Sequence, residues 1–519
     1  MLIMDSDKPD SISTAIDESG LRRTASNHVE WQKDHTQYPR NWSSYRKCYD
    51  ATMIVFFEFY TLSSAPFLSH DMPLMECRTV ISTTGPSAAT AAMQEYHLTR
   101  GVALVAFVFM QVQSYRTWQA IGGLLVPPFS ESFGRRKPYL YSCAAFSIGS
   151  LITGVVPSAA GVFVGRFMCG FASAAPSVVI AGSVQDLYAG THRVWMILVW
   201  NSTTTLGLTI GPVYGAYLAD TIGWRWIYYT SAMVTTVLLL LLFMIRESRS
   251  TKLLSQKIGE LEKEYHEKLE SRHNPDAVPN ARALVELVLL RPARLVATEP
   301  IVVLVSLLSA TSWGLVYLFT ESLSVVYSLY GWSETTTSLA FIAIALGIPL
   351  SILPRMWEVR QSKQKKLRNQ RTNPEDKIYG FVIAAPVLAC SLWLFSWTIP
   401  PRAHTHWAVS MTGLVGIGFA ANEFAYTLSG YLADSYTIYA SSGLAGLAFF
   451  RALVSGLMPL FAYPMFSELG GNVAGSILAA VATVFCITPY VFLRYGGPLR
   501  ERSRFARYSA EINEQYGDE

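Results

Sequence analysis

Three acidic residues lie in or beside long apolar stretches, where an ionisable group could take up and release a proton. Glu58 sits in the run Phe-Phe-Glu-Phe-Tyr, Glu423 follows Asn422 in a second apolar run, and Glu321 lies just beyond the predicted end of a third. A carboxyl group in apolar surroundings binds a proton more readily than one in water. We therefore expect proton exchange at these acids; a purely structural hydrogen-bonding role is the alternative for each.

One arginine also lies inside an apolar stretch. Arg166 belongs to Gly-Arg-Phe-Met-Cys-Gly, residues 165–170. A lone arginine in a spanning helix is costly and normally faces the interior of a bundle beside a partner. The alternative is an arginine near a helix end whose long side chain reaches the membrane surface.

The composition is that of a polytopic membrane protein. Hydrophobic residues make up 51% of the 519 residues and charged residues only 15%, and the mean hydropathy is +0.27. A soluble protein has about 25% charged residues. The six cysteines are scattered without a Cys-x-x-Cys pair, so we expect no metal, no disulfide framework and no cofactor. Net charge is a modest +4, and we expect no nucleic-acid partner.

Spanning helices need about 20 apolar residues each, and the chain has twelve such stretches. We predict helices at Ala51–Leu68, Val102–Val126, Tyr139–Val156, Gly161–Val184, Val194–Leu218, Trp226–Ile245, Pro300–Leu318, Thr336–Leu353, Tyr379–Trp397, Trp407–Leu428, Ala440–Tyr463 and Val473–Leu493. The fold class is therefore all-α and membrane-embedded, with two groups of six helices.

The distribution of lysine and arginine predicts the orientation of these helices. Cations gather after the second helix, between the two halves, at residues 355–377 and in the C-terminal tail. Because basic loops stay in the cytosol, both termini should be cytosolic. We expect five parts: a disordered cytosolic tail at 1–50, helix bundles at 51–245 and 300–493, a cytosolic loop at 246–299 whose helical stretch has a solvated face, and a cytosolic tail at 494–519.

A glycine-rich helix end runs into a cationic turn at residues 122–137, Gly-Gly-Leu-Leu-Val-Pro-Pro-Phe-Ser-Glu-Ser-Phe-Gly-Arg-Arg-Lys. Gly134 allows a tight reversal, and Arg135 and Arg136 hold the turn at the cytosolic surface. Glu131 is placed to form a charge link with them that could break as helices move. The alternative is an ordinary basic loop.

This stretch resembles the loop between helices 2 and 3 of the major facilitator superfamily. Its amino-acid sequence is most similar to that of the fungal twelve-helix drug–proton antiporter branch. The resemblance implies the major facilitator fold and transport by alternating access. It makes Glu58 the first choice for proton exchange, because helix 1 lines the cavity in this family. It places Arg166 near the coupling machinery, although Cys169 stands where the family has glutamine, and it matches Asp186 to a position that pairs with the cations of the turn.

A second resemblance lies in the fifth helix. Residues 207–215, Gly-Leu-Thr-Ile-Gly-Pro-Val-Tyr-Gly, are similar to the element diagnostic of antiporters in this superfamily. Its glycines, Gly207, Gly211 and Gly215, give a smooth face for close helix packing, and Pro212 bends the helix. A general packing motif is the alternative reading.

The transport cavity is expected to be mainly aromatic and aliphatic, with few charges. The candidate lining residues are Tyr60, Trp200, Asn201, Trp313, Tyr317, Asn422, Phe424 and Tyr426. Lipid-facing positions are the alternative for the aromatic ones.

One region departs from the family pattern. The polar run Gln111–Gln119 falls in the middle of the second predicted helix. We interpret it as part of an insertion, which is either real or an artefact of the gene model such as retained intron sequence.

We interpret the chain as a monomeric, proton-coupled exporter of drugs, toxins or secondary metabolites, in the plasma membrane or an internal membrane. Its partners would be a small-molecule substrate, protons and the lipid bilayer. Alternatives are a transporter of one metabolite such as a polyamine or organic acid, a membrane-embedded enzyme, and a transporter-like receptor. The histidines lie mostly in loops and tails and no nucleophile–base pair stands out, which weighs against the enzyme.

Overall fold

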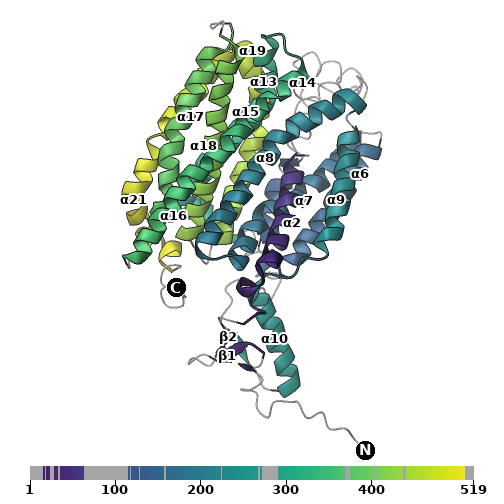
Figure 1. Ribbon diagram of the computed structural model, residues 1–519, viewed down its shortest axis with the longest axis vertical. Helices are drawn as coiled ribbons and strands as arrows, with labels where there is room; N and C mark the ends of the chain where they lie inside the picture. Colours follow the sequence, from purple (N-terminus) through teal and green to yellow (C-terminus); the bar gives the residue numbers. More distant parts are fainter. Residues whose placement is uncertain are drawn as a thin grey trace, which may run out of the picture.

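The computed structural model describes residues 16–17, 19–23, 28–32, 35–63, 115–116, 118–127, 129–131, 133–156, 159–223, 225–266, 269–271, 290–368, 374–401, 405–436 and 440–508. Within these residues it is almost entirely helical, with two helix bundles standing side by side and a small extension below them (Figure 1).

The first bundle comes from the N-terminal half of the chain. It contains α2 (Ser44–Ser63), α6 (Arg136–Val155), α7 (Ala159–Leu187), α8 (Gly190–Ile222) and α9 (Arg225–Leu242), together with helical backbone at residues 118–127. Helix α6 packs on α7 and α9, and α2 packs on α8 and α7. All six predicted N-terminal helices therefore have helical counterparts in the described residues.

The second bundle comes from the C-terminal half. It contains α12 (Arg291–Thr298), α13 (Pro300–Ser328), α14 (Glu334–Ser338), α15 (Ala340–Gly347), η3 (Ile348–Ser351), α16 (Ile352–Leu367), η4 (Pro374–Ile378), α17 (Tyr379–Thr398), α18 (Trp407–Ser435), α19 (Ala440–Glu468), α20 (Gly471–Phe485) and α21 (Thr488–Arg502). The elements α14, α15, η3 and α16 together form the predicted eighth helix, and α20 with α21 forms the twelfth.

Eight helices in the described part of the chain are long and apolar enough to cross a membrane, and the run Ser442–Met458 in α19 is a shorter apolar one. Helices α2 and α8 are not among these eight. Helix α2 carries Arg46, Lys47 and Asp50 in its first turns and the buried Glu58 further on, and α8 carries buried polar residues such as Asn201. Polar side chains that face a bundle interior lower the mean hydropathy of a helix without preventing it from spanning.

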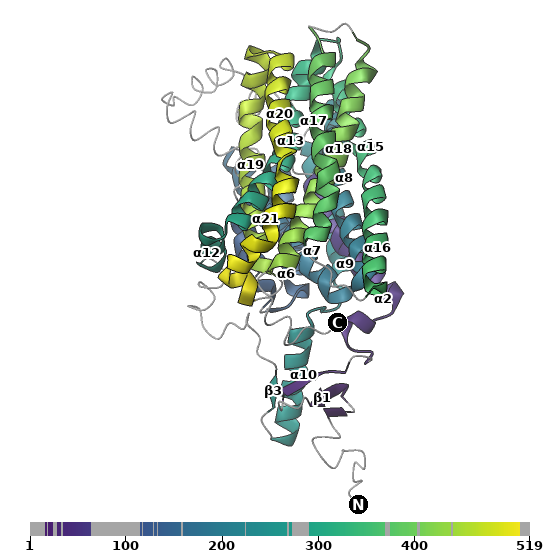
Figure 2. The same cartoon turned by 90° about the vertical axis from the view of Figure 1, so that its left-hand side faces the viewer.

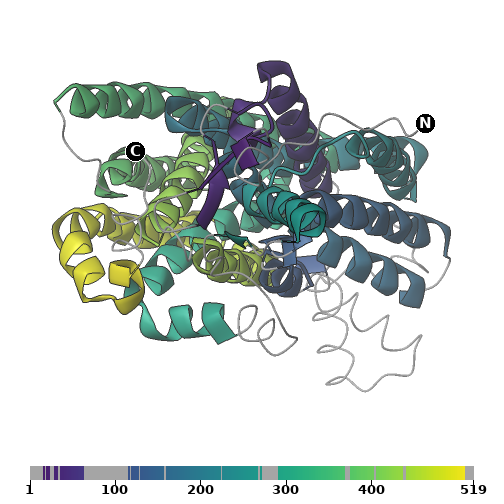
Figure 3. The ribbon, with the colours of Figure 1, turned by 90° about the horizontal axis from the view of Figure 1, so that it is seen from below.

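The bundles meet along α8, which packs on α14, α15 and α18, and along α7, which packs on α19. Seen from below, the two halves lie side by side (Figure 3), and in the perpendicular view the C-terminal half stands in front of the N-terminal half (Figure 2). An apolar cluster of Leu62, Leu208, Trp313, Val316, Tyr317 and Ala421 joins residues of both halves. Any site between the bundles is therefore closed by side chains from both.

Several predicted helix ends were wrong. Helix α2 begins at Ser44 rather than Ala51, because its polar first turns are held by the Arg46–Asp50 ion pair of 3.1 Å. Helix α13 continues ten residues past Leu318 to Ser328, so Glu321 lies inside a helix and not beyond its end. Helix α16 reaches Leu367, so Arg355 belongs to a helix and not to a cytosolic loop.

The predicted disordered tail also contains ordered structure. Strand β1 (Leu21–Arg23) pairs antiparallel with β2 (His28–Trp31), and β2 pairs parallel with β3 (Glu270–Ser271). These strands pack on the apolar face of α10 (Ser250–Tyr265), where Leu254, Ile258 and Leu261 are buried with Leu21 and Val29. Sequence reasoning missed this extension because neither segment has a core of its own, and the charged residues of α10 suggested only a solvated helix.

The predicted insertion lies partly outside the residues that the structure describes. The loop before the second helix and residues 111–114 and 117 of the polar run lie outside the described residues.

Candidate functional site

A small cavity lies between the two bundles. Its lining residues come from α2, α7, α13, α19 and residues 115–127: Glu58, Leu62, Arg116, Gln119, Ser177, Val178, Trp313, Ala448, Arg451 and Ala452. The free volume is about 10 Å³, room for about one water molecule. A drug-sized ligand needs at least about 300 Å³, so the bundles must separate before such a ligand can enter.

Among the described residues that line the cavity, Glu58 is the only acid, and it is 1% exposed. Its Oε2 accepts a hydrogen bond from the indole Nε1 of Trp200 on α8, while its Oε1 has no partner among the described residues. A buried carboxylate with an unpaired oxygen is costly in its ionised form. The structure therefore places Glu58 where the sequence predicted, in a cavity where taking up a proton would relieve that cost.

Two arginines share the cavity, and the sequence reasoning singled out neither. The guanidinium of Arg116 lies 4.2 Å from the ring centre of Tyr317, and that of Arg451 on α19 lies 4.2 Å from the ring centre of Trp313. Arg451 also attracts Glu58 electrostatically. The signal that could have found Arg451 is the one used for Arg166, a lone arginine in an apolar stretch. Arg116 belongs instead to the polar run Gln111–Gln119, which we interpret as part of an insertion.

Arg166 itself is elsewhere. It is 8% exposed on α7, and its Nη2 donates to the Tyr228 hydroxyl on α9. It is not among the residues that line the cavity, and the arginine that acts electrostatically on Glu58 is Arg451. Cys169, one turn further along α7, lies 3.5 Å from the Phe146 carbonyl oxygen and the Ser150 hydroxyl. This part of α7 therefore packs within the N-terminal bundle.

The predicted cavity residues have different locations. Trp313 lines the cavity and Tyr317 packs beside it under Arg116. Asn422 links the bundles, accepting from Thr205 at 3.3 Å and donating to Ser202 at 3.2 Å. Tyr60 packs within the N-terminal bundle. Of the ten described lining residues, five are aromatic or aliphatic and three are ionisable. The sequence did not indicate these three together, because helix periodicity does not reveal which face of each helix meets the opposite bundle.

Two further candidates, Asn201 and Phe424, lie outside the cavity lining. The Asn201 amide donates to the Ile197 carbonyl oxygen one turn earlier in α8 at 3.0 Å. The ring of Phe424 packs edge-on against Phe381 in the C-terminal bundle. These contacts of the two side chains lie within a single bundle.

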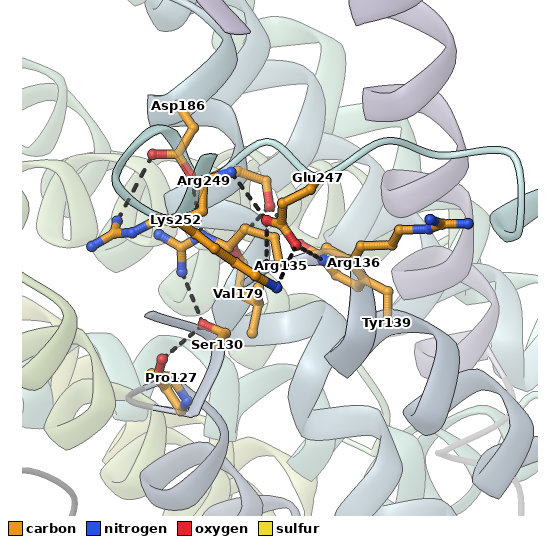
Figure 4. A network of polar contacts seen from close by, with 11 residues as sticks. Pro127, Ser130, Arg135, Arg136, Tyr139, Val179, Asp186, Glu247, Arg249 and Lys252 are labelled. Atoms are coloured by element: carbon orange, nitrogen blue, oxygen red, sulfur yellow. Dashed lines mark hydrogen bonds and ion pairs between the residues drawn. The ribbon is translucent and has the colours of Figure 1, made fainter. Parts of the chain in front are cut away.

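A network of charges surrounds the turn after residue 131, at the end of the bundles from which α10 extends (Figure 4). Arg135 is 4% exposed, and its Nε lies 3.1 Å from Asp186 Oδ2 on α7 while its Nη1 donates to Ser130 at 2.9 Å. Burial alone would lower the pKa of Arg135, but attraction by Asp186 and Glu131 more than offsets this effect and raises it. Arg135 is therefore a fixed positive charge, and its predicted pairing with Asp186 is confirmed.

Glu247, which sequence reasoning overlooked, closes this network from the segment between α9 and α10. It accepts from the backbone N–H of Arg135 at 2.7 Å and of Arg136 at 3.3 Å, and pairs with Lys252 at 3.6 Å. Gly134 has φ +93°, and a side chain there would collide with the Glu247 carboxylate. The glycine is therefore required both for the turn and for the close approach of Glu247.

We expect Arg135→Gln to lower transport about tenfold or more, because Asp186 would be left buried without its main cation, at a cost of several kcal/mol. Uptake or efflux measured at matched protein levels checks the expectation. Lys137→Gln, at an exposed position two residues away, is the matched control and should retain full transport. Equal activity of both variants would refute a role for the buried pair.

A second buried charge group lies in the C-terminal bundle. Arg355 is 1% exposed; its Nη2 lies 2.6 Å from Glu423 Oε2, its Nη1 contacts Glu358, and its guanidinium lies 3.8 Å from the ring centre of Tyr426. Gly380 on α17 leaves room for this group, since a Cβ there would meet Arg355 and Glu423. Glu423 and Tyr426 thus belong to an ion-pair network that sequence reasoning did not predict.

One ion pair crosses between the bundles at the same end as the Arg135 network. Arg193 Nη2 on α8 lies 3.4 Å from Asp434 Oδ1 on α18, and Asp434 Oδ2 lies 2.5 Å from Lys377 Nζ. Since both partners are about 30% exposed, such a pair contributes about 0.2–1 kcal/mol. It is a weak, reversible link of the kind that a moving interface can break.

We expect Arg193→Glu to speed modification of a cysteine placed at Ala448, which lines the cavity, by about two- to fivefold from this side, the equivalent of breaking a partly exposed pair. The measurement uses a membrane-impermeant thiol reagent and a background without the native cysteines. The exchanged pair Arg193→Asp with Asp434→Arg should return the rate toward that of the parent. A rate unchanged by the single reversal would show that the pair does not hold the bundles together.

The glycine element of α8 lies at a close helix contact. Gly207, Gly211, Pro212 and Gly215 are buried, and a Cβ at Gly207 would lie 2.7 Å from the Phe59 carbonyl oxygen on α2. The spacing thus brings α8 against the helix that carries Glu58. This contact fits both the packing reading and the antiporter reading of the motif.

Comparisons with known proteins agree with this architecture. The family model of the Major Facilitator Superfamily matches residues 77–459. The chain is 28% identical over 488 residues to the efflux pump radE of Floropilus chiversii, covering 92% of this chain and 86% of that protein. It is 30% identical over 485 residues to the MFS-type transporter penM of Penicillium rubens, covering 92% and 90%.

A solved structure shares the fold at low sequence identity. The proton:xylose symporter XylE aligns with a TM-score of 0.59 and 15% sequence identity, over 88% of this chain and 96% of that one. The two-bundle arrangement, the charged turn and the family match over most of the chain together identify this multi-pass membrane protein as a member of the major facilitator superfamily of transporters.

Proposed function

We propose that this protein is a proton-coupled exporter that works by alternating access, with Glu58 as the group that carries the proton. The observation that supports this is the position of Glu58: a buried carboxyl with one unpartnered oxygen, in a cavity lined by both bundles. Intramembrane acids of this kind are functional sites by default. A proton taken up there changes the charge of the cavity in the place where a substrate would bind.

In this proposal the two bundles rock around the cavity so that it opens to one side at a time. The Arg193–Asp434 pair and the Arg135 network lie at one end of the bundles, which the positive-inside pattern assigns to the cytosol. Their intact contacts correspond to a closed cytosolic end. In our proposal the predicted lock of Glu131 with Arg135 and Arg136 also includes Asp186, which pairs with Arg135, and Glu247, which accepts from the backbone of both arginines. Glu321 and Arg166 stay predicted contributors to coupling.

The substrates we propose are drugs, toxins or secondary metabolites, exported across the plasma membrane by a monomer. The support is that similar fungal proteins are named as efflux pumps, radE among them. The apolar cluster that shares Leu62 and Trp313 with the cavity lining suits solutes with an apolar body.

The test is the accumulation of a panel of fluorescent and antifungal compounds in cells with and without the gene. Lower accumulation of several compounds, reversed by a protonophore, is the expected result. Accumulation that is lowered but indifferent to the protonophore would refute proton coupling. No change for any compound would refute broad export and favour a transporter for a single metabolite.

A further inference from the structure

The charges of the cavity do not balance. Among its ten lining residues are two guanidinium groups, of Arg116 and Arg451, and one carboxyl group, of Glu58. With Glu58 ionised the lining carries one excess positive charge, and with Glu58 protonated it carries two.

In the part of the chain that the structure describes, Arg116 is buried without an acid beside it. It is 6% exposed; its Nη1 donates to the Gln119 side chain, and its Nη2 has no hydrogen-bond partner among the described residues. A buried cation needs a paired charge or hydrogen bonds to offset its lost hydration. The contact with the Tyr317 ring supplies part of this stabilisation and leaves the unused N–H groups available to an oxygen ligand.

Arg451 approaches the same cavity from the opposite bundle. Its guanidinium stacks on Trp313, which holds the plane of the group without using its N–H donors. The ion pairs found among the described residues include none between Arg451 and an acid; its attraction to Glu58 is electrostatic. Two guanidiniums therefore face one space from two bundles that move relative to each other.

We propose that the cavity binds an organic anion, whose carboxylate or comparable acidic oxygen atoms pair with Arg116 and Arg451. The apolar body of the anion would lie against Leu62, Val178 and Ala448, which are in the same lining. Guanidinium groups match carboxylates through paired N–H donors. This inference rests on the proposed function only in taking the cavity as the transport site, and it supplies the substrate class.

The experiment compares three probes that share one aromatic body and differ in charge: 1-naphthoate, 1-naphthamide and 1-naphthylmethylamine. Binding to the purified full-length protein is followed at neutral pH by quenching of tryptophan fluorescence, without any gradient. We expect 1-naphthoate to bind at least about tenfold more tightly than the other two. In Arg451→Gln and Arg116→Gln, its affinity should fall about tenfold to hundredfold, the effect of a lost charged hydrogen bond, while 1-naphthamide binding stays unchanged.

Arg451→Lys, which keeps the charge, should retain a preference for the anion, and Arg494→Gln, at an exposed position, should behave as the parent protein. The charge series in the parent protein needs no variant, so misfolding of one variant does not remove the test. Tightest binding of the amine, or an anion preference that survives both glutamine variants, would overturn the inference. Anion binding that depends on the arginines but is not accompanied by export in cells would support the inference and refute the proposed function. Protonophore-sensitive export of amines alone would support the proposed function and refute the inference.

Discussion

Replacement of Glu58 by glutamine is expected to abolish gradient-driven export while leaving the protein folded. Glutamine keeps the size of the side chain and can still accept from Trp200, but it cannot take up a proton. A difference of one pH unit supplies about 1.4 kcal/mol per proton, which sustains about a tenfold concentration ratio. We therefore expect Glu58→Gln to lose at least a tenfold accumulation difference across the membrane, and its residual transport to be independent of pH.

Transport into inside-out vesicles under an imposed pH gradient is the direct measurement. Glu260→Gln, an exposed acid on α10 far from the cavity, is the matched control and should behave as the parent. Glu58→Asp keeps an ionisable group on a shorter side chain and should retain a pH-dependent remnant. Normal gradient-driven transport by Glu58→Gln would refute the proposal that this residue carries the proton. Glu423 and Glu321 would then be the remaining candidates.

The largest effect on stability is expected from Arg355→Gln. In the C-terminal bundle this arginine separates Glu358 and Glu423, and Glu423 is 0% exposed. Removal of one partner from a buried ion pair costs about 3–5 kcal/mol. The variant would leave two acids facing each other across the vacated site, so we expect its apparent melting temperature to fall by on the order of 10 °C.

Thermal unfolding of the purified protein in one detergent, followed by loss of monodisperse material, measures this change. Arg360→Gln, an exposed arginine on the same helix, should leave the melting temperature unchanged. The double variant Arg355→Gln with Glu423→Gln should recover part of the loss, because it removes one of the two opposed acids. A fall of less than about 2 °C in the single variant would mean that the network contributes little net stability, as some buried ion pairs do.

Helix positions were predictable because they depend on local properties of the chain. Apolar runs of about 20 residues separated by cationic loops specify spanning helices one at a time, and all twelve have helical counterparts in the described residues. The ends were less predictable. Helix α16 continues past its apolar run because Arg355 and Glu358, one turn apart inside the protein, form an ion pair. A hydropathy pattern predicts a polar loop for such charged residues.

The site was predictable only where a single residue carried the signal. Glu58, Gly134 and the Arg135–Asp186 pair were found because an acid in an aromatic run, a glycine before cations and a matched motif each stand out alone. Glu247 was missed because its role depends on the fold bringing the α9–α10 segment to the turn. Arg451 was missed because we considered a lone arginine in an apolar run only at Arg166 and did not apply the same criterion to the other helices.

The sequence by itself determined the order and approximate positions of the helices, the position of the charged turn and the presence of a carboxyl group within an apolar helix. Only the tertiary structure decided which charges share a space: Arg166 lies against Tyr228, while Arg116 and Arg451 meet Glu58 between the bundles. The physical reason is that a helix forms from contacts within about four residues, whereas the charge balance of a cavity depends on the rotation of five separate segments toward one another.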